Sequence, residues 1–200
     1  METIGPPHGT QCRPPHRNVP SPQLLLAAAN AFVGLDDLSS GDERTGVPEL
    51  VLRQLGRNGA RHWDTAILHH WGFWSHFDHE TDRSAWPVIA AATPAELAAF
   101  GEAHGVLRTR PLEGDIFLQF GPSHREFVRA GVIARVLSAG QASGSESYFD
   151  VLAIEGNTGD GGAIGGRRTL RIARRLSSRA GDRFLRWAEL EGDHALRDWE

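Results

Sequence analysis

The sequence predicts an α+β domain in which N-terminal helices pack on an antiparallel β-sheet. Two observations predict it. Helix start and stop signals occupy the first half of the 200-residue chain, whereas valine- and isoleucine-rich segments divided by Gly and Ser clusters occupy the second half. Helices followed by strands are typical of the α+β class.

Four helices are expected before the strands. Ser21-Pro22 is a good helix start and Gly34 a good stop, and Pro48 opens a second helix that Gly56 closes. A third helix should begin near Asp64, with Asp64 as the N-cap and Trp63 packing against Leu68. The fourth begins at the capping box Thr93-Pro94-Ala95-Glu96 and ends at Gly105.

Four strands are expected next, at residues 116–120, 127–137, 148–154 and 169–173. Residues 182–190 are expected to form a short helix bearing Phe184, Leu185 and Trp187. We therefore divide the chain into a disordered Pro-rich leader (1–21), one domain (22–176) and a C-terminal helical tail (177–200).

Composition excludes several functional classes. The single cysteine, Cys12, rules out an internal disulfide framework and a CxxC metal site. The formal net charge of −4 is mild, and the arginines at 167, 168, 171, 174 and 175 are interpreted as a solvated strand edge, so no nucleic-acid partner is expected. No apolar stretch is long enough to span a membrane. The run from Leu24 to Val33 resembles the apolar region of a signal peptide, but we favour an amphipathic helix there. No cofactor is expected.

Several stretches occur in the order found in one family of cell-wall hydrolases. Trp63-Asp64-Thr65-Ala66-Ile67 stands where that family has Trp-Cys-Ala-Ala-Phe, and residues 111–117 match its Pro-Gly-Asp turn into a strand. Residues 128–133 stand where it has His-Val-Gly-Ile-Val, and Ile154-Glu155-Gly156-Asn157 matches its strand end. The chain thus resembles the CHAP-type (cysteine–histidine amidohydrolase/peptidase) and NlpC-type amidases and peptidases over residues 30–175. The resemblance implies a papain-like fold.

The resemblance also implies that the catalytic residues have been replaced. Asp64 occupies the cysteine position and Arg129 the histidine position, and the third polar group survives as Glu155 or Asn157. A carboxylate is a poor nucleophile for an amide, and a guanidinium is not a base near neutral pH. We therefore expect a catalytically inactive domain with a binding or scaffold role toward cell-wall peptide, glycan or a protein partner.

The replacements preserve the charges of the thiolate–imidazolium pair that the active enzymes use. Asp64 and Arg129 are therefore expected to meet in a salt bridge under the old cleft, with Glu155 or Asn157 nearby. Trp63 and Trp71 are the expected cleft-binding aromatics.

Two other functions remain open. His62, His69 and His76 recur every seven residues, and His76 and His79 are three apart, so His69, His76 and His79 could hold a metal ion for hydrolysis. No ligand motif such as His-Glu-x-x-His is present, and histidine also packs as a partly polar aromatic. The remaining alternative is a plain protein-interaction domain.

Overall fold

The computed structural model describes residues 21–34, 63–78, 83–84, 86–88, 91, 93–142, 146–158 and 168–190. Three helices lie within these ranges: α1 (Pro22–Ala31), α3 (Asp64–Ser75) and α4 (Pro94–Ala103). A two-stranded hairpin, β1 (Phe77–Asp78) and β2 (Arg83–Ser84), follows α3. The main strands are β3 (Leu107–Arg108), β4 (Ile116–Gly121), β5 (Glu126–Ala142), β6 (Glu146–Thr158), β7 (Arg168–Ser177) and β8 (Arg183–Leu185).

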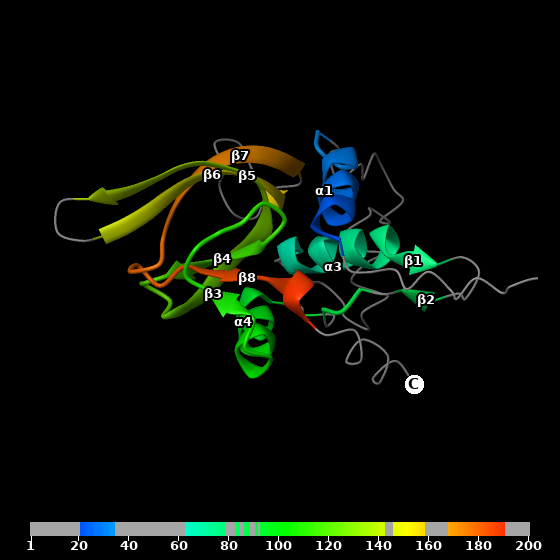
Figure 1. Cartoon of the computed structure of the whole chain (residues 1–200), viewed down its shortest axis with the longest axis horizontal. Coiled ribbons are helices and arrows are strands. Elements are labelled where there is room, and N and C mark those ends of the chain that lie inside the picture. Colours follow the sequence, from blue (N-terminus) through cyan, green and yellow to red (C-terminus); the bar gives the residue numbers. More distant parts are fainter. Residues whose placement is uncertain are drawn as a thin grey trace, which may run out of the picture.

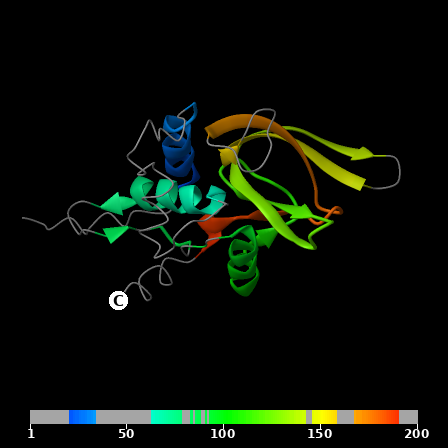
Figure 2. The same cartoon turned by 180° about the vertical axis from the view of Figure 1, so that it is seen from behind.

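The six main strands form one sheet in the order β3-β8-β4-β5-β6-β7, and every neighbouring pair is antiparallel. The predicted α+β class with an antiparallel sheet is confirmed. The long β5–β6 hairpin projects beyond the body of the domain, away from α1 and α3 (Figure 1). Seen from behind, α4 lies below the sheet, on the side of the domain away from α1 (Figure 2).

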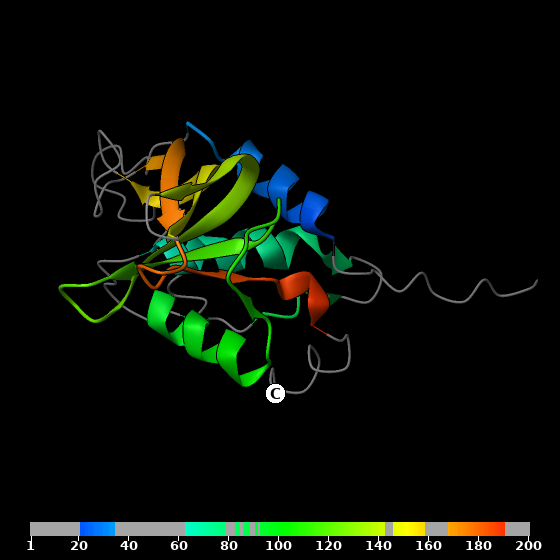
Figure 3. The same ribbon diagram turned by 60° about the vertical axis from the view of Figure 1, so that its left-hand side comes forward.

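Alternation along the strands places apolar side chains on both faces of the sheet. On one face Ile116, Val132, Ile154 and Leu185 join the helices in the larger core. On the other face Phe117, Ile133, Val151 and Phe184, with their neighbours, form a second, smaller core. Figure 3 shows α1 and α3 on one side of β8, with α4 on the other side.

The helix signals in the sequence have direct counterparts. Helix α1 has Ser21 as its N-cap and Pro22 in its first turn, and it buries Leu25 and Ala29. Helix α4 has Thr93 as its N-cap, and the Thr93 side chain accepts a hydrogen bond from the Glu96 N–H at 3.2 Å. Local capping chemistry of this kind does not depend on the rest of the fold, so the sequence predicts it well.

The C-terminal prediction is wrong for residues 177–190. Instead of a helix, Arg183–Leu185 form β8, which lies between β3 and β4 inside the sheet, and a 3₁₀ turn follows at Trp187–Glu189. Phe184 packs in the second core and Leu185 in the first. Phe184 and Leu185 face opposite sides of the sheet, as adjacent residues of a strand do. Three residues are too few for the sequence to show whether apolar positions repeat every two residues, as in a strand, or every 3.6 residues, as in a helix. No domain boundary therefore follows residue 176.

The leader (1–20) and the expected Pro48–Gly56 helix lie outside the described residues. None of the described helices is both long and apolar enough to cross a membrane.

Candidate functional site

Asp64 begins helix α3, but it does not cap the helix as expected. Trp63 is the N-cap, with no side-chain cap bond. The Asp64 carboxylate instead turns toward the sheet, where Oδ2 accepts a hydrogen bond from the main-chain N–H of Ala130 on β5 at 3.0 Å. Asp64 is 3 % exposed, so this contact is buried. Its position in the first turn keeps the negative charge at the favourable end of the helix dipole.

The acceptor is needed because β5 and β6 separate at this point. Their pairing runs from Ala142–Glu146 to Val132–Ile154 and stops there. Beyond it β5 pairs with β4 alone, while β6 continues beside β7. The N–H of Ala130 lies past the last β5–β6 pair, and a buried N–H without an acceptor is costly. Asp64 therefore supplies the acceptor that β6 does not provide at this point.

Arg129 and Glu155 bridge the gap between β5 and β6. Arg129 Nη1 lies 2.9 Å from Glu155 Oε2, and both side chains are buried. Glu155 also receives two hydrogen bonds from Arg174 of β7, from Nε to Oε1 at 2.7 Å and from Nη2 to Oε2 at 2.8 Å. Three strands are thus linked through one carboxylate.

Charge is balanced across this cluster of Asp64, Arg129, Glu155 and Arg174, which we call the strand-gap cluster. It contains two carboxylates and two guanidinium groups. Burial is the main influence on Glu155 and raises its pKa to about 7; the Arg129 charge lowers it and the Asp64 charge raises it further. The pKa of Glu155 thus depends on both Arg129 and Asp64.

The structure thus brings Asp64, Arg129 and Glu155 together at the N-terminus of α3. Arg129 pairs with Glu155, and a direct Asp64–Arg129 salt bridge stays a prediction. Asn157 is also buried and takes a left-handed backbone conformation with φ of 56°, which Asn tolerates better than most residues.

Trp63 and Trp71 do not line an accessible cleft. Trp63 is 8 % exposed and packs close to β6, where a Cβ at Gly156 would come within 2.7 Å of its ring. Trp71 is 1 % exposed in the main core. The expectation that Trp71 contacts a ligand is wrong, because its helical spacing turns it into the core instead of outward.

His76 is occupied by structural hydrogen bonds. Its Nε2 accepts from the main-chain N–H of Ser21 at 3.0 Å, so the neutral ring carries its proton on Nδ1, which lies 3.0 Å from the Gly72 carbonyl oxygen. Burial lowers the pKa of His76 and, with the neighbouring His70 charge, lowers the pKa of His69 to about 4. His62 and His79 lie outside the described residues.

With its Nε2 lone pair engaged, His76 cannot bind a metal ion without breaking the contact that holds the start of α1. The described residues contain no group of three or more His, Cys, Asp or Glu side chains suited to a metal ion.

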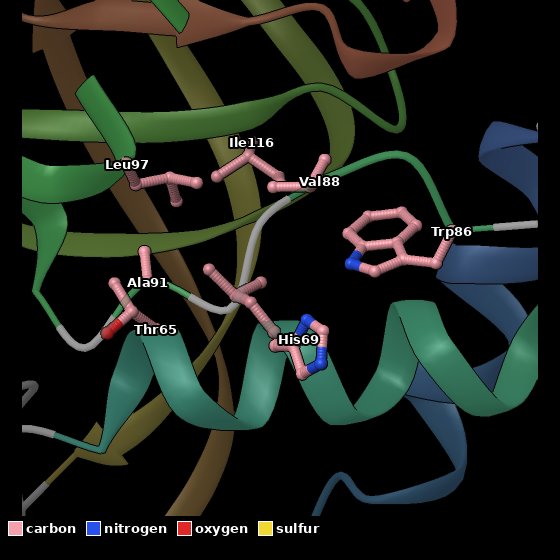
Figure 4. Close-up of a pocket in the computed structure, with 8 residues that line it drawn as sticks. Thr65, His69, Trp86, Val88, Ala91, Leu97 and Ile116 are labelled. Carbon is pink, nitrogen blue, oxygen red and sulfur yellow. The ribbon is translucent and has the colours of Figure 1, made fainter. Parts of the chain in front are cut away.

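A small hollow lies between α3, α4 and β4 (Figure 4). It has room for about one water molecule, which is too small for a peptide or a sugar. Its lining is mostly apolar and comprises Thr65, Leu68, His69, Trp86, Val88, Ala91, Leu97 and Ile116.

Sequence reasoning missed Arg174. The sequence pattern indicates a solvated strand edge for Arg174, yet in the structure Arg174 is the bidentate partner of Glu155. Its alternation with Arg171 and Arg175 could have indicated a different environment, because adjacent positions on a strand face opposite sides.

Comparisons with protein-family models, with curated proteins and with solved structures each found no match to this chain.

Proposed function

We propose that this chain is a catalytically inactive papain-like domain of the CHAP/NlpC kind with a scaffold role. The observation that carries the proposal is the strand-gap cluster. The family that the sequence resembles has a cysteine at a helix N-terminus, a histidine on a strand and a third polar group on a neighbouring strand. Asp64, Arg129 and Glu155 occupy comparable places in this chain, which supports the proposal.

The chemistry of these residues supports an inactive site. The hydrolytic reaction needs a thiolate and a group that accepts and returns a proton. Asp64 already accepts the Ala130 N–H, and Arg129 is committed to Glu155. All three residues are buried, which leaves them poorly placed to meet a substrate. A scaffold role is therefore favoured over binding of cell-wall peptide or glycan at this position.

Restoring the two missing groups tests the proposal. In a Cys12→Ser background, the pair Asp64→Cys and Arg129→His should create a thiol whose pKa lies below the ordinary value of about 8.5. The pH dependence of thiolate absorbance measures it. The matched control carries Asp64→Cys with Arg129→Gln and should titrate at a higher pH, since it lacks the imidazolium.

Either of two results would contradict the proposal. One is the same thiol pKa in both variants when unfolding curves show that both are folded. The other is release of amino groups from purified muramoyl peptides by the unmodified protein. If the substituted proteins do not fold, the second assay still decides. Titration of the unmodified protein with a muramoyl tetrapeptide, followed by amide chemical shifts, tests the binding alternative separately.

A further inference from the structure

Strand β7 forms one margin of the six-stranded sheet, so one of its two hydrogen-bonding edges faces away from β6 (Figure 1). The direction of each main-chain group follows from the contacts at the two ends. At one end the Thr169 carbonyl accepts a hydrogen bond from the Gly34 N–H at 2.9 Å. At the other, the Ser177 N–H donates to Asp182 Oδ2 at 2.8 Å. Both residues therefore point their main-chain groups outward.

Because direction alternates along a strand, Arg171, Ala173 and Arg175 also point their N–H and C=O groups outward. The pairing of β7 with β6 has no irregularity between Tyr148–Ser177 and Glu155–Leu170, so the alternation holds across this stretch. Within the described part of the chain, no main-chain group pairs with these three residues on the outer side. The open edge is three residues long and closed at both ends.

The side chains of the open edge are exposed and carry positive charge. Arg171, Ala173 and Arg175 share the face opposite to Arg174, whose guanidinium is turned inward to Glu155. Arg171 contacts Asn30 of α1, which is uncharged. Arg175 donates two hydrogen bonds to the Asp150 carboxylate, at 2.7 and 2.9 Å, so Asp150 offsets part of its charge. Its guanidinium also lies 4.3 Å from the centroid of the Tyr148 ring, and the side chain is 65 % exposed. Two guanidinium groups thus flank a small residue.

We propose that this edge binds an extended acidic segment of another protein by β-strand addition. Main-chain groups of three residues supply the affinity, and carboxylates four positions apart on the added strand meet Arg171 and Arg175. Ala173 between them leaves space for the intervening side chain. The proposal concerns a surface separate from the strand-gap cluster and does not depend on the inactivity of that site.

Arginine at a sheet edge also discourages pairing with another copy of the same chain, because like charges would face each other. An acidic strand turns the same charges into attraction. A capped seven-residue peptide of alternating threonine and valine, with glutamates four positions apart, is the probe. Anisotropy of a fluorescent label on the peptide measures its binding to the full chain. Lysine in place of the glutamates should weaken binding at least tenfold.

Ala173→Pro is the sharpest variant. The Ala173 N–H faces outward, so proline removes a donor from the open edge and none from the ladder with β6. We expect at least a tenfold loss of binding, with Ala173→Ser as the control that keeps the N–H, the small side chain and the affinity. N-methylation of the probe at its edge-facing amides makes the same test from the ligand side, should the proline variant not fold.

Arg171→Glu should weaken binding about fivefold or more. Arg110→Glu makes the same change in net charge at an exposed position elsewhere and should leave binding unchanged. Absence of saturable binding by the acidic peptide overturns the proposal. Equal binding of acidic and basic peptides, or full affinity of the N-methylated probe, overturns it as well.

Discussion

The most informative perturbation of the strand-gap cluster is Glu155→Gln. Glu155 is fully buried, and burial raises its pKa from 4.5 to about 7 in the folded protein. A carboxyl group with a raised folded pKa binds its proton more tightly when folded. Ionising it as the pH rises therefore costs stability, and the loss falls between about pH 4.5 and pH 7.

The size of the effect follows from the two pKa values. At about 1.4 kcal/mol for each pH unit between them, ionisation of Glu155 lowers the free energy of unfolding by about 3 kcal/mol over this range. Glutamine has no proton to lose, so the variant lacks this loss. Its stability relative to the unmodified protein should rise by about 3 kcal/mol between pH 4.5 and pH 8.

Urea unfolding followed by tryptophan fluorescence at pH 4.5, 6 and 8 measures the difference. Removing the carboxylate also leaves Arg129 and Arg174 without their partner, which lowers the stability of the variant at every pH. The test is therefore the change with pH in the stability difference between the two proteins, and not the difference at any one pH. Glu113→Gln, at an exposed position, is the control and should follow the unmodified protein. A stability difference that is constant or falls with pH would refute the reasoning. It would mean that the two guanidinium groups outweigh burial and keep Glu155 ionised.

Three further substitutions test the surrounding structure. Asp64→Ala should lower the free energy of unfolding by about 1–3 kcal/mol, because the buried N–H of Ala130 loses its acceptor; Asp64→Asn keeps an acceptor oxygen and should lose less, and equal losses would contradict the role. His69→Gln should reduce the loss of stability that occurs as the pH falls from 6.5 toward 4. Burial lowers the pKa of His69 to about 4, so protonating this side chain disfavours the folded state. Thermal unfolding as a function of pH measures the effect, and a profile identical to that of the unmodified protein would contradict the prediction. Gly72→Ala should cost about 1–3 kcal/mol in urea unfolding, because the added Cβ would stand 2.1 Å from a Trp86 ring atom; unaltered stability would show that Trp86 moves freely.

Much of the helical part of the fold could be predicted because its signals are local. Ser21-Pro22 and Thr93-Pro94 define helix starts through chemistry confined to a few residues, and the structure has both. The four longer strands were also predictable, although β5 runs to Ala142, beyond the expected end at residue 137. Strand length depends on the partner strand, and β6 provides pairing out to Glu146.

The sequence predicted the positions of the candidate site and one contact, the Asp64–Arg129 salt bridge, which stays a prediction. Helix signals and the family resemblance placed Asp64 at the start of a helix and Arg129 and Glu155 on strands, and the structure brings all three together. The sequence could not show that Arg129 would pair with Glu155 or that Arg174 would join them. Those partners come from β6 and β7, and their proximity depends on where β5 and β6 separate.

The sequence by itself therefore determined the class of the fold, the helix starts and the charged residues available to the site, because these depend on neighbours a few positions away. Only the tertiary structure decided that residues 183–185 complete the sheet as β8, that Trp71 is buried in the core, and that the strand-gap cluster forms around one buried carboxylate. The physical reason is the same in each case. Buried main-chain groups and charges must find partners, and the nearest partner in space is often far away in sequence.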